Sequence, residues 1–90
     1  MAEINWTNEA QKCLKDIHDY IAIDNPRVAH RLISDIYNRV QILKRLPELG
    51  HHYERYPELN IRILLYGHYR IVYLLKSDDH IDILGIFIRY

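Results

Sequence analysis

The sequence predicts an α+β fold, in which an N-terminal α-helical hairpin packs on a small antiparallel β-sheet. Apolar residues recur at helical spacing through the first half of the 90 residues. The last third instead holds three strand-like runs rich in isoleucine and tyrosine, separated by turn residues. A chain of this length supports one hydrophobic core, so residues 1–90 are expected to form a single domain.

The first helix is expected to follow a short strand at residues 3–6. Thr7 or Asn8 can cap it, because both side chains accept hydrogen bonds from free amides at a helix start. Its apolar stripe contains the lone cysteine, Cys13, which is predicted to be a small core residue. With one cysteine no intrachain disulfide can form. The stripe consists of Ala10, Cys13, Leu14, Ile17 and Ile21.

The second helix is expected to start at once. Asn25 is a good N-cap, and Pro26 fits the first helical position, where its missing N–H costs nothing. The apolar stripe continues to Leu46, and Pro47 with Gly50 ends the helix. So short a link makes the two helices an antiparallel hairpin.

The remaining chain is expected to be a loop followed by a meander of three strands. Residues 47–60 contain two prolines and one glycine, which indicates a loop with room for one extended segment. The predicted strands are Ile61–Tyr66, Tyr69–Leu75 and His80–Ile88, linked by Gly67-His68 and by Ser77-Asp78-Asp79.

Two arginines interrupt these apolar runs. If Gly67 and His68 form a two-residue turn, Tyr66 pairs with Tyr69, and Arg62 then lies on the opposite face of the sheet from Arg70. A three-residue turn would place both arginines on one face. Each arginine either contacts phosphate or pairs with an acidic group of a helix or of a partner protein.

Composition limits the classes of function. Twelve Lys and Arg balance twelve Asp and Glu, so the chain lacks the basic excess typical of domains that bind nucleic acid mainly through phosphates. No apolar run approaches the ~20 residues of a membrane span, and no signal peptide is visible, so a cytoplasmic location without membrane attachment is expected. The spacing of His51, His52, His68 and His80 fits no metal-ligand motif, and neither a metal nor a cofactor is expected.

The ordered set of motifs resembles the RelE/ParE superfamily of toxins from bacterial type II toxin–antitoxin systems. The motifs are Ala10, Leu14, Ile17, Tyr20 and Ile21 in the first helix, then Asn25-Pro26 with Ala29, Leu46-Pro47 with Gly50, Arg62, Tyr69-Arg70-Ile71-Val72-Tyr73, and Ile81 to Phe87. The long helical hairpin looks more like the ParE side of the superfamily.

The resemblance implies a ParE-like toxin that inhibits DNA gyrase and is neutralised by a cognate antitoxin of the ParD or RelB kind. The alternative that it implies is a RelE-like endonuclease, which cuts mRNA on the ribosome without a metal. A second alternative is a degenerate, non-toxic member that only binds its antitoxin.

Under the nuclease alternative, metal-free RNA cleavage needs a base, a cation near the phosphate and an acid. The candidates for these roles are Arg62, Arg70, Arg89, Tyr90, His52 and Glu54, together with His51 in the same loop. The chain departs from the family where relatives often carry histidine after the Ile-Leu-Gly-Ile-Phe run and arginine after Gly50. Ile88 and His51 stand at these positions, which weakens the residue-by-residue transfer both of a nuclease mechanism and of a gyrase-contacting tail.

Overall fold

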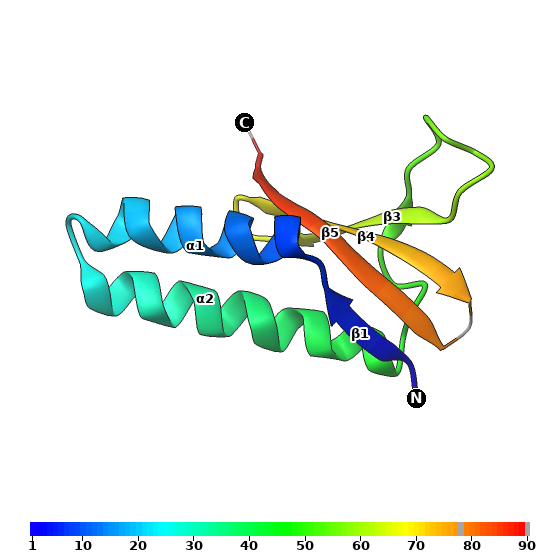
Figure 1. Cartoon of the computed structure of the whole chain (residues 1–90), viewed down its shortest axis with the longest axis horizontal. Coiled ribbons are helices and arrows are strands. Elements are labelled where there is room, and N and C mark those ends of the chain that lie inside the picture. Colours follow the sequence, from blue (N-terminus) through cyan, green and yellow to red (C-terminus); the bar gives the residue numbers. More distant parts are fainter. Residues whose placement is uncertain (78, 90) are drawn as a thin grey trace.

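The computed structural model describes residues 1–77 and 79–89 and contains two helices on one face of a five-stranded sheet (Figure 1). The elements are β1 (Glu3–Trp6), α1 (Asn8–Ala22), α2 (Pro26–Gln41), a 3₁₀ turn (Ile42–Lys44), β2 (His51–His52), β3 (Ile61–Tyr66), β4 (Tyr69–Ser77) and β5 (His80–Ile88). The strand order is β1-β5-β4-β3-β2. The predicted fold class is therefore confirmed.

Both helix starts are where the capping residues predict them. The Thr7 hydroxyl accepts a hydrogen bond from the Ala10 amide at 3.1 Å and donates one to the Ile83 carbonyl at 2.6 Å, which ties α1 to β5. The Asn25 side chain accepts from the Val28 amide at 3.1 Å, and Pro26 opens α2. Local side-chain contacts thus set the helical hairpin.

Three boundaries or pairings differ from the sequence prediction. The second helix ends at Gln41 and tightens into a 3₁₀ turn, so the prediction that it reaches Leu46 was wrong. Strand β4 continues past Leu75 to Ser77, which pairs with His80. Strand β1 runs parallel to β5, whereas all other pairs in the sheet are antiparallel. The predicted turn at 77–79 includes Asp78, which lies outside the described residues.

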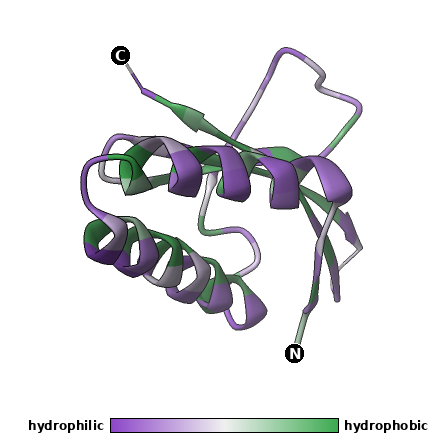
Figure 2. Ribbon diagram, turned by 60° about the vertical axis from the view of Figure 1, so that its left-hand side comes forward, coloured by the Kyte–Doolittle hydropathy of each residue, from purple (hydrophilic) through white to green (hydrophobic). Residues whose placement is uncertain are grey.

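The core lies between the helices and the sheet. Figure 2 shows that the helices are amphipathic, with one polar and one apolar side, and that the strands are largely hydrophobic. The largest fully buried side chains are Ile36, Val40, Leu43, Ile71, Tyr73, Ile81 and Ile83. Cys13 is partly buried and packs against this cluster, as its place on the apolar stripe predicts.

The two-residue turn at Gly67-His68 is present, and it determines which residues of β3 and β4 lie on each face of the sheet. Tyr66 pairs with Tyr69, Arg62 with Tyr73, and Leu65 with Arg70. Since Tyr73 is buried in the core, Arg62 lies on the face that carries the helices, and Arg70 lies on the other face, hereafter the open face. A bulge between Val72 and Tyr73 changes the register with β5, so that Phe87 pairs with Arg70 on the open face.

Candidate functional site

The Tyr73 hydroxyl holds the turn at residues 47–50. This fully buried side chain donates a hydrogen bond to the Pro47 carbonyl at 2.7 Å and accepts one from the Gly50 amide at 2.9 Å. Burial raises the pKa of the Tyr73 phenol, against the opposing effects of the Gly50 amide and of Arg62. The neutral phenol is thus the form that bridges the two ends of the turn.

Arg62 is bound to the same turn. Its Nη1 donates to the Glu48 carbonyl at 3.0 Å and to the Gly50 carbonyl at 2.8 Å, while its Nε donates to the Asn60 side chain at 3.0 Å. Backbone carbonyls therefore bind Nη1 of this guanidinium, and the acidic partner or phosphate weighed from the sequence stays a prediction. These hydrogen bonds tie Arg62 to the turn at residues 47–50 and stabilise the segment that follows the helical hairpin.

Arg70 lines a small cleft on the open face. The cleft has a volume of about 280 Å³ and is lined by Tyr53, Ile63, Arg70, Val72 and Phe87. Arg70 is exposed, and its neighbours across the strands are Leu65 and Phe87. Among residues 1–77 and 79–89, no carboxylate forms an ion pair with Arg70. Its guanidinium thus borders an apolar hollow from one side.

The other sequence candidates are dispersed. The His52 ring contacts the Leu59 carbonyl through Nε2 at 3.2 Å, and Glu54 is exposed in the loop after β2. Arg89 is exposed just beyond β5, and its backbone amide donates to the His68 carbonyl at 2.5 Å. Tyr90 lies outside the described residues.

The sheet itself separates the two arginines that were candidates for a phosphate clamp. Arg62 is bonded to the turn at residues 47–50, and Arg70 lies on the open face. Two guanidinium groups on opposite faces cannot bind the same phosphate. Sequence reasoning missed Tyr73 as the partner of the turn, although one of the two registers that it left open, the one with a two-residue turn, places Tyr73 on the same face as Arg62.

A second concave region lies along α1, next to the end of β5. One hollow of about 560 Å³ is lined by Asp16, Ile17, Tyr20, Ile21, Tyr69 and Ile88. A neighbouring hollow of about 430 Å³ shares Asp16, Ile17 and Ile88 and adds Cys13, Ile86 and Phe87. We call these two hollows the α1/β5 groove. Strand β1 pairs only with residues 80–83 of β5, so the groove begins where β1 ends.

Large apolar side chains surround this groove and the tip of the hairpin. Tyr20 is 78% exposed, Ile23 81% and Ile88 49%. Apolar exposure on this scale beside a groove is typical of a surface that a partner protein covers.

Neither a metal centre nor a membrane helix is found in the part of the chain that the structure describes. Within it, no three His, Cys, Asp or Glu side chains are grouped so that they could hold a metal ion. No described helix is long and apolar enough to cross a bilayer.

The sequence matches the family model of the ParE toxin of the type II toxin–antitoxin system parDE over residues 4–89. The chain belongs to the ParE toxin family. This confirms the resemblance on the ParE side, and the toxin–antitoxin assignment with it. The open-face cleft and the α1/β5 groove are therefore surfaces of a ParE toxin.

A solved structure shares the fold of this ParE toxin. It is a chain of the structure described as the chromosomal ParDE TA system from P. aeruginosa, with a TM-score of 0.78 and 24% sequence identity. The match covers 100% of this chain and 98% of the other. A search of curated proteins found no match.

Proposed function

We propose that this ParE toxin acts by binding and inhibiting DNA gyrase, and that a cognate antitoxin of the ParD kind neutralises it. The family assignment supports a toxin within a toxin–antitoxin pair. The observation that favours a protein target over RNA cleavage is the placement of Arg62 and Arg70 on opposite faces of the sheet. Arg62 is held by carbonyl groups, which leaves Arg70 as the only one of the two that a ligand on the open face can reach.

The α1/β5 groove is the surface that we assign to the antitoxin. It is largely apolar, and exposed Tyr20 and Ile88 border it. An amphipathic helix or an extended segment can place apolar side chains into such a groove. Antitoxin binding would then remove from water the apolar surface that the small sheet leaves uncovered.

Two assays with the same purified protein test the target. Gyrase is incubated with relaxed plasmid, ATP and increasing toxin, and supercoiling and DNA cleavage are followed; programmed ribosomes with mRNA receive the same toxin in parallel. Toxin mixed beforehand with its antitoxin is the matched control in both assays. We expect inhibition of gyrase with intact mRNA, and relief of that inhibition by antitoxin.

Cleaved mRNA with unaffected gyrase would instead support the RelE-like alternative. In that case the nuclease roles proposed for Arg62, Arg70, Arg89, Tyr90, His52 and Glu54 would have to be tested one by one. Tight antitoxin binding without effect in either assay would identify a degenerate, non-toxic member.

A further inference from the structure

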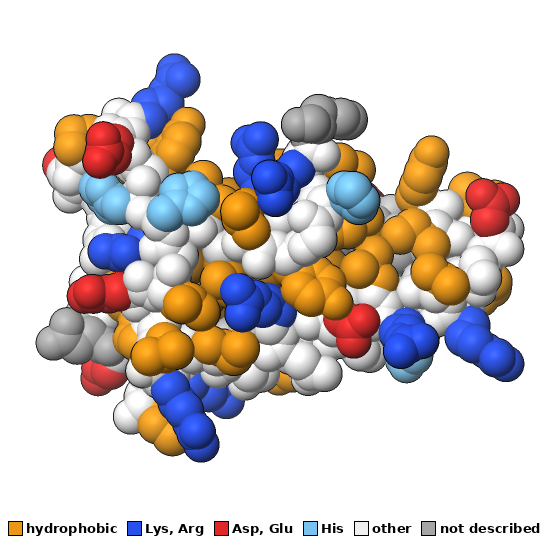
Figure 3. Space-filling view, turned by 180° about the vertical axis from the view of Figure 1, so that it is seen from behind, with side chains coloured by type: hydrophobic (Ala, Val, Ile, Leu, Met, Phe, Trp, Pro, Cys, Tyr) orange, Lys and Arg blue, Asp and Glu red, His pale blue; other side chains and the backbone are white. Residues whose placement is uncertain are grey.

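The open face of the sheet carries an apolar surface that the two helices do not cover. Both helices pack on the opposite face, where the core lies. Seen from behind, the molecule shows hydrophobic side chains interspersed with basic, acidic and histidine side chains (Figure 3). On the open face, Leu65 is 38% exposed and Phe87 52%. Exposed apolar side chains interspersed with charged ones are found on protein-binding surfaces.

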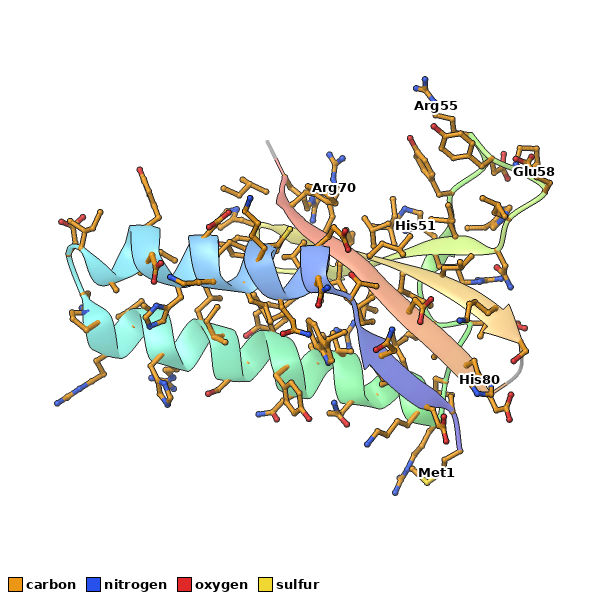
Figure 4. All side chains as sticks on the ribbon, viewed as in Figure 1. Met1, His51, Arg55, Glu58, Arg70 and His80 are labelled. Carbon is orange, nitrogen blue, oxygen red and sulfur yellow. The ribbon has the colours of Figure 1, made fainter. Side chains whose placement is uncertain are left out.

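The cleft on this face is lined by the residue types of a binding hot spot. Ile63 and Val72 are its apolar strand residues, Tyr53 and Phe87 its aromatic ones, and Arg70 its cation. Aromatic residues and arginine carry much of the binding energy in protein interfaces, because they combine a large apolar area with directed polar contacts. In Figure 4, Arg70 and Arg55 project on the same side of the molecule, away from α2.

The loop wall of the cleft is also aromatic. Tyr53 and Tyr56 lie with their ring centroids 6.2 Å apart, and the Arg55 guanidinium lies 6.0 Å from the centroid of Tyr56. Tyr53 connects this cluster to the sheet, since its backbone amide donates to the Ile61 carbonyl at 2.8 Å. The wall is therefore anchored to β3 at the edge of the cleft.

Charge distinguishes between the possible occupants. Among the described residues, Arg70 is the one charged residue that lines the cleft. Glu54, Arg55 and Glu58 lie in the loop wall, and Asp82 lies on the same face. Asp82 is paired with Lys76 at 3.4 Å. A nucleic-acid strand brings one phosphate per nucleotide, whereas the cations Arg55, Arg70 and Lys76 of this face are matched by the carboxylates Glu54, Glu58 and Asp82, so it has no basic excess. A protein segment with one carboxylate beside an apolar side chain matches one arginine beside an apolar hollow.

We infer that the open-face cleft binds a segment of DNA gyrase that places an aliphatic or aromatic side chain against Ile63 and Val72 and a carboxylate on Arg70. This inference rests on the proposed function and specifies the surface through which it acts. It also separates the two partners: the antitoxin binds the α1/β5 groove, and gyrase binds the open face. Phe87 lines both the cleft and the groove, so an antitoxin that moves its ring alters the gyrase site.

The test uses charge reversal at Arg70 with a matched control. Arg70→Glu and Arg27→Glu change the net charge equally, and both positions are exposed, but Arg27 lies in the first turn of α2. Phe87→Ala removes the aromatic ring that β5 contributes to the cleft, without changing the net charge. For each variant, gyrase supercoiling inhibition, affinity for the cognate antitoxin, and thermal unfolding followed by circular dichroism are measured.

We expect Arg70→Glu and Phe87→Ala to raise the toxin concentration for half-inhibition of gyrase by about tenfold or more. Arg27→Glu should inhibit like wild type, and Arg70→Glu should keep its melting temperature and its affinity for antitoxin. If Arg70→Glu unfolds, Arg70→Gln replaces it, with the same expectation of weaker inhibition.

Three results would overturn the inference while leaving the proposed function intact. In each, the wild type inhibits gyrase. The first is equal inhibition by Arg70→Glu and wild type. The second is loss of antitoxin binding in Arg70→Glu with inhibition retained, which assigns the cleft to the antitoxin. The third is binding of a labelled single-stranded RNA that Arg70→Glu abolishes while inhibition persists. Absence of gyrase inhibition by the wild type would instead overturn the proposed function itself, and the inference with it.

Discussion

Arg62 and Tyr73 are direct partners across β3 and β4, and their side chains end on the same turn of the backbone. Tyr73 bridges the Pro47 carbonyl and the Gly50 amide, and Arg62 bonds to the carbonyls of Glu48 and Gly50. Two side chains of the sheet thereby satisfy backbone groups of a turn that has no regular secondary structure. The relationship explains why an arginine is tolerated next to the core.

Tyr73→Phe should lower the free energy of unfolding by about 1–3 kcal/mol, because the Gly50 amide and the Pro47 carbonyl lose their buried partner. Tyr37→Phe is the matched control: Tyr37 is 49% exposed and stacks on Trp6 with ring centroids 5.9 Å apart. Its hydroxyl removal should change stability by less than about 0.5 kcal/mol. Urea unfolding curves measure both, and equal stability of the two variants would refute the role of the Tyr73 hydroxyl.

The stability should fall at alkaline pH. Burial raises the pKa of Tyr73, and burial together with Asp35 raises the pKa of Tyr66, from the ordinary value of 10.0. The folded protein holds these protons more tightly, so the stabilisation is complete below about pH 10 and is lost as the pH rises through the folded-state pKa values. The free energies of unfolding of wild type and Tyr73→Phe are measured between about pH 8 and 11, the range in which tyrosine side chains titrate. The free energy of unfolding should decline less steeply with pH in the variant. A parallel decline would contradict this explanation.

Gly50→Ala should destabilise the chain by steric conflict. A Cβ at Gly50 would lie 2.8 Å from Cε1 of Tyr73 and 2.9 Å from the Ile63 carbonyl oxygen, so the turn must move. Overpacking of this kind costs about 1–3 kcal/mol. Gly67→Ala is a useful comparison, because Gly67 has open space around it but a φ of 54°, which predicts a cost of about 1 kcal/mol from backbone strain alone. Thermal unfolding that leaves Gly50→Ala as stable as wild type would show that the turn is loosely held.

Arg62→Ala and Arg70→Ala should differ in stability. Loss of the Arg62 guanidinium leaves the Glu48 and Gly50 carbonyls without these hydrogen bonds, at a cost of about 1–3 kcal/mol. Loss of the exposed Arg70 guanidinium should change the free energy of unfolding by less than about 0.5 kcal/mol. Chemical denaturation of the pair measures this difference, and the reverse order of stability would contradict the assignment of a structural role to Arg62.

Tyr20→Glu should weaken antitoxin binding without unfolding the toxin, because Tyr20 is 78% exposed and borders the α1/β5 groove. A carboxylate there would have to be buried by the antitoxin, which predicts a loss of affinity of about tenfold or more. Lys12→Gln changes the net charge by the same amount at an exposed position of α1 outside the groove and should bind normally. Calorimetric titration compares the three proteins; unchanged affinity of Tyr20→Glu would remove this groove from the antitoxin interface.

Local signals predicted much of the fold. Thr7 and Asn25 were recognisable as caps because their hydrogen bonds are made within one helical turn. The turn at Gly67-His68 was recognisable in the same way, but the sequence left two-residue and three-residue turns open; the structure has the two-residue turn, which places Arg62 and Arg70 on opposite faces.

Features that depend on distant parts of the chain were not predictable in this way. The parallel pairing of β1 with β5 joins segments from the two ends of the sequence. The bulge opposite Val72 lies in a run that is apolar on both faces, so the alternation of residues gave no sign of it. The hydrogen bonds of Arg62 depend on where the backbone carbonyls of a loop lie, and the residue types alone do not predict that position.

The most direct test of the proposed function is the supercoiling of relaxed plasmid by purified DNA gyrase in the presence of this ParE toxin. We predict inhibition that increases with toxin concentration and disappears when the cognate antitoxin is added first, with ribosome-bound mRNA left intact in the parallel reaction. Unchanged supercoiling at toxin concentrations that saturate the antitoxin would contradict the proposal.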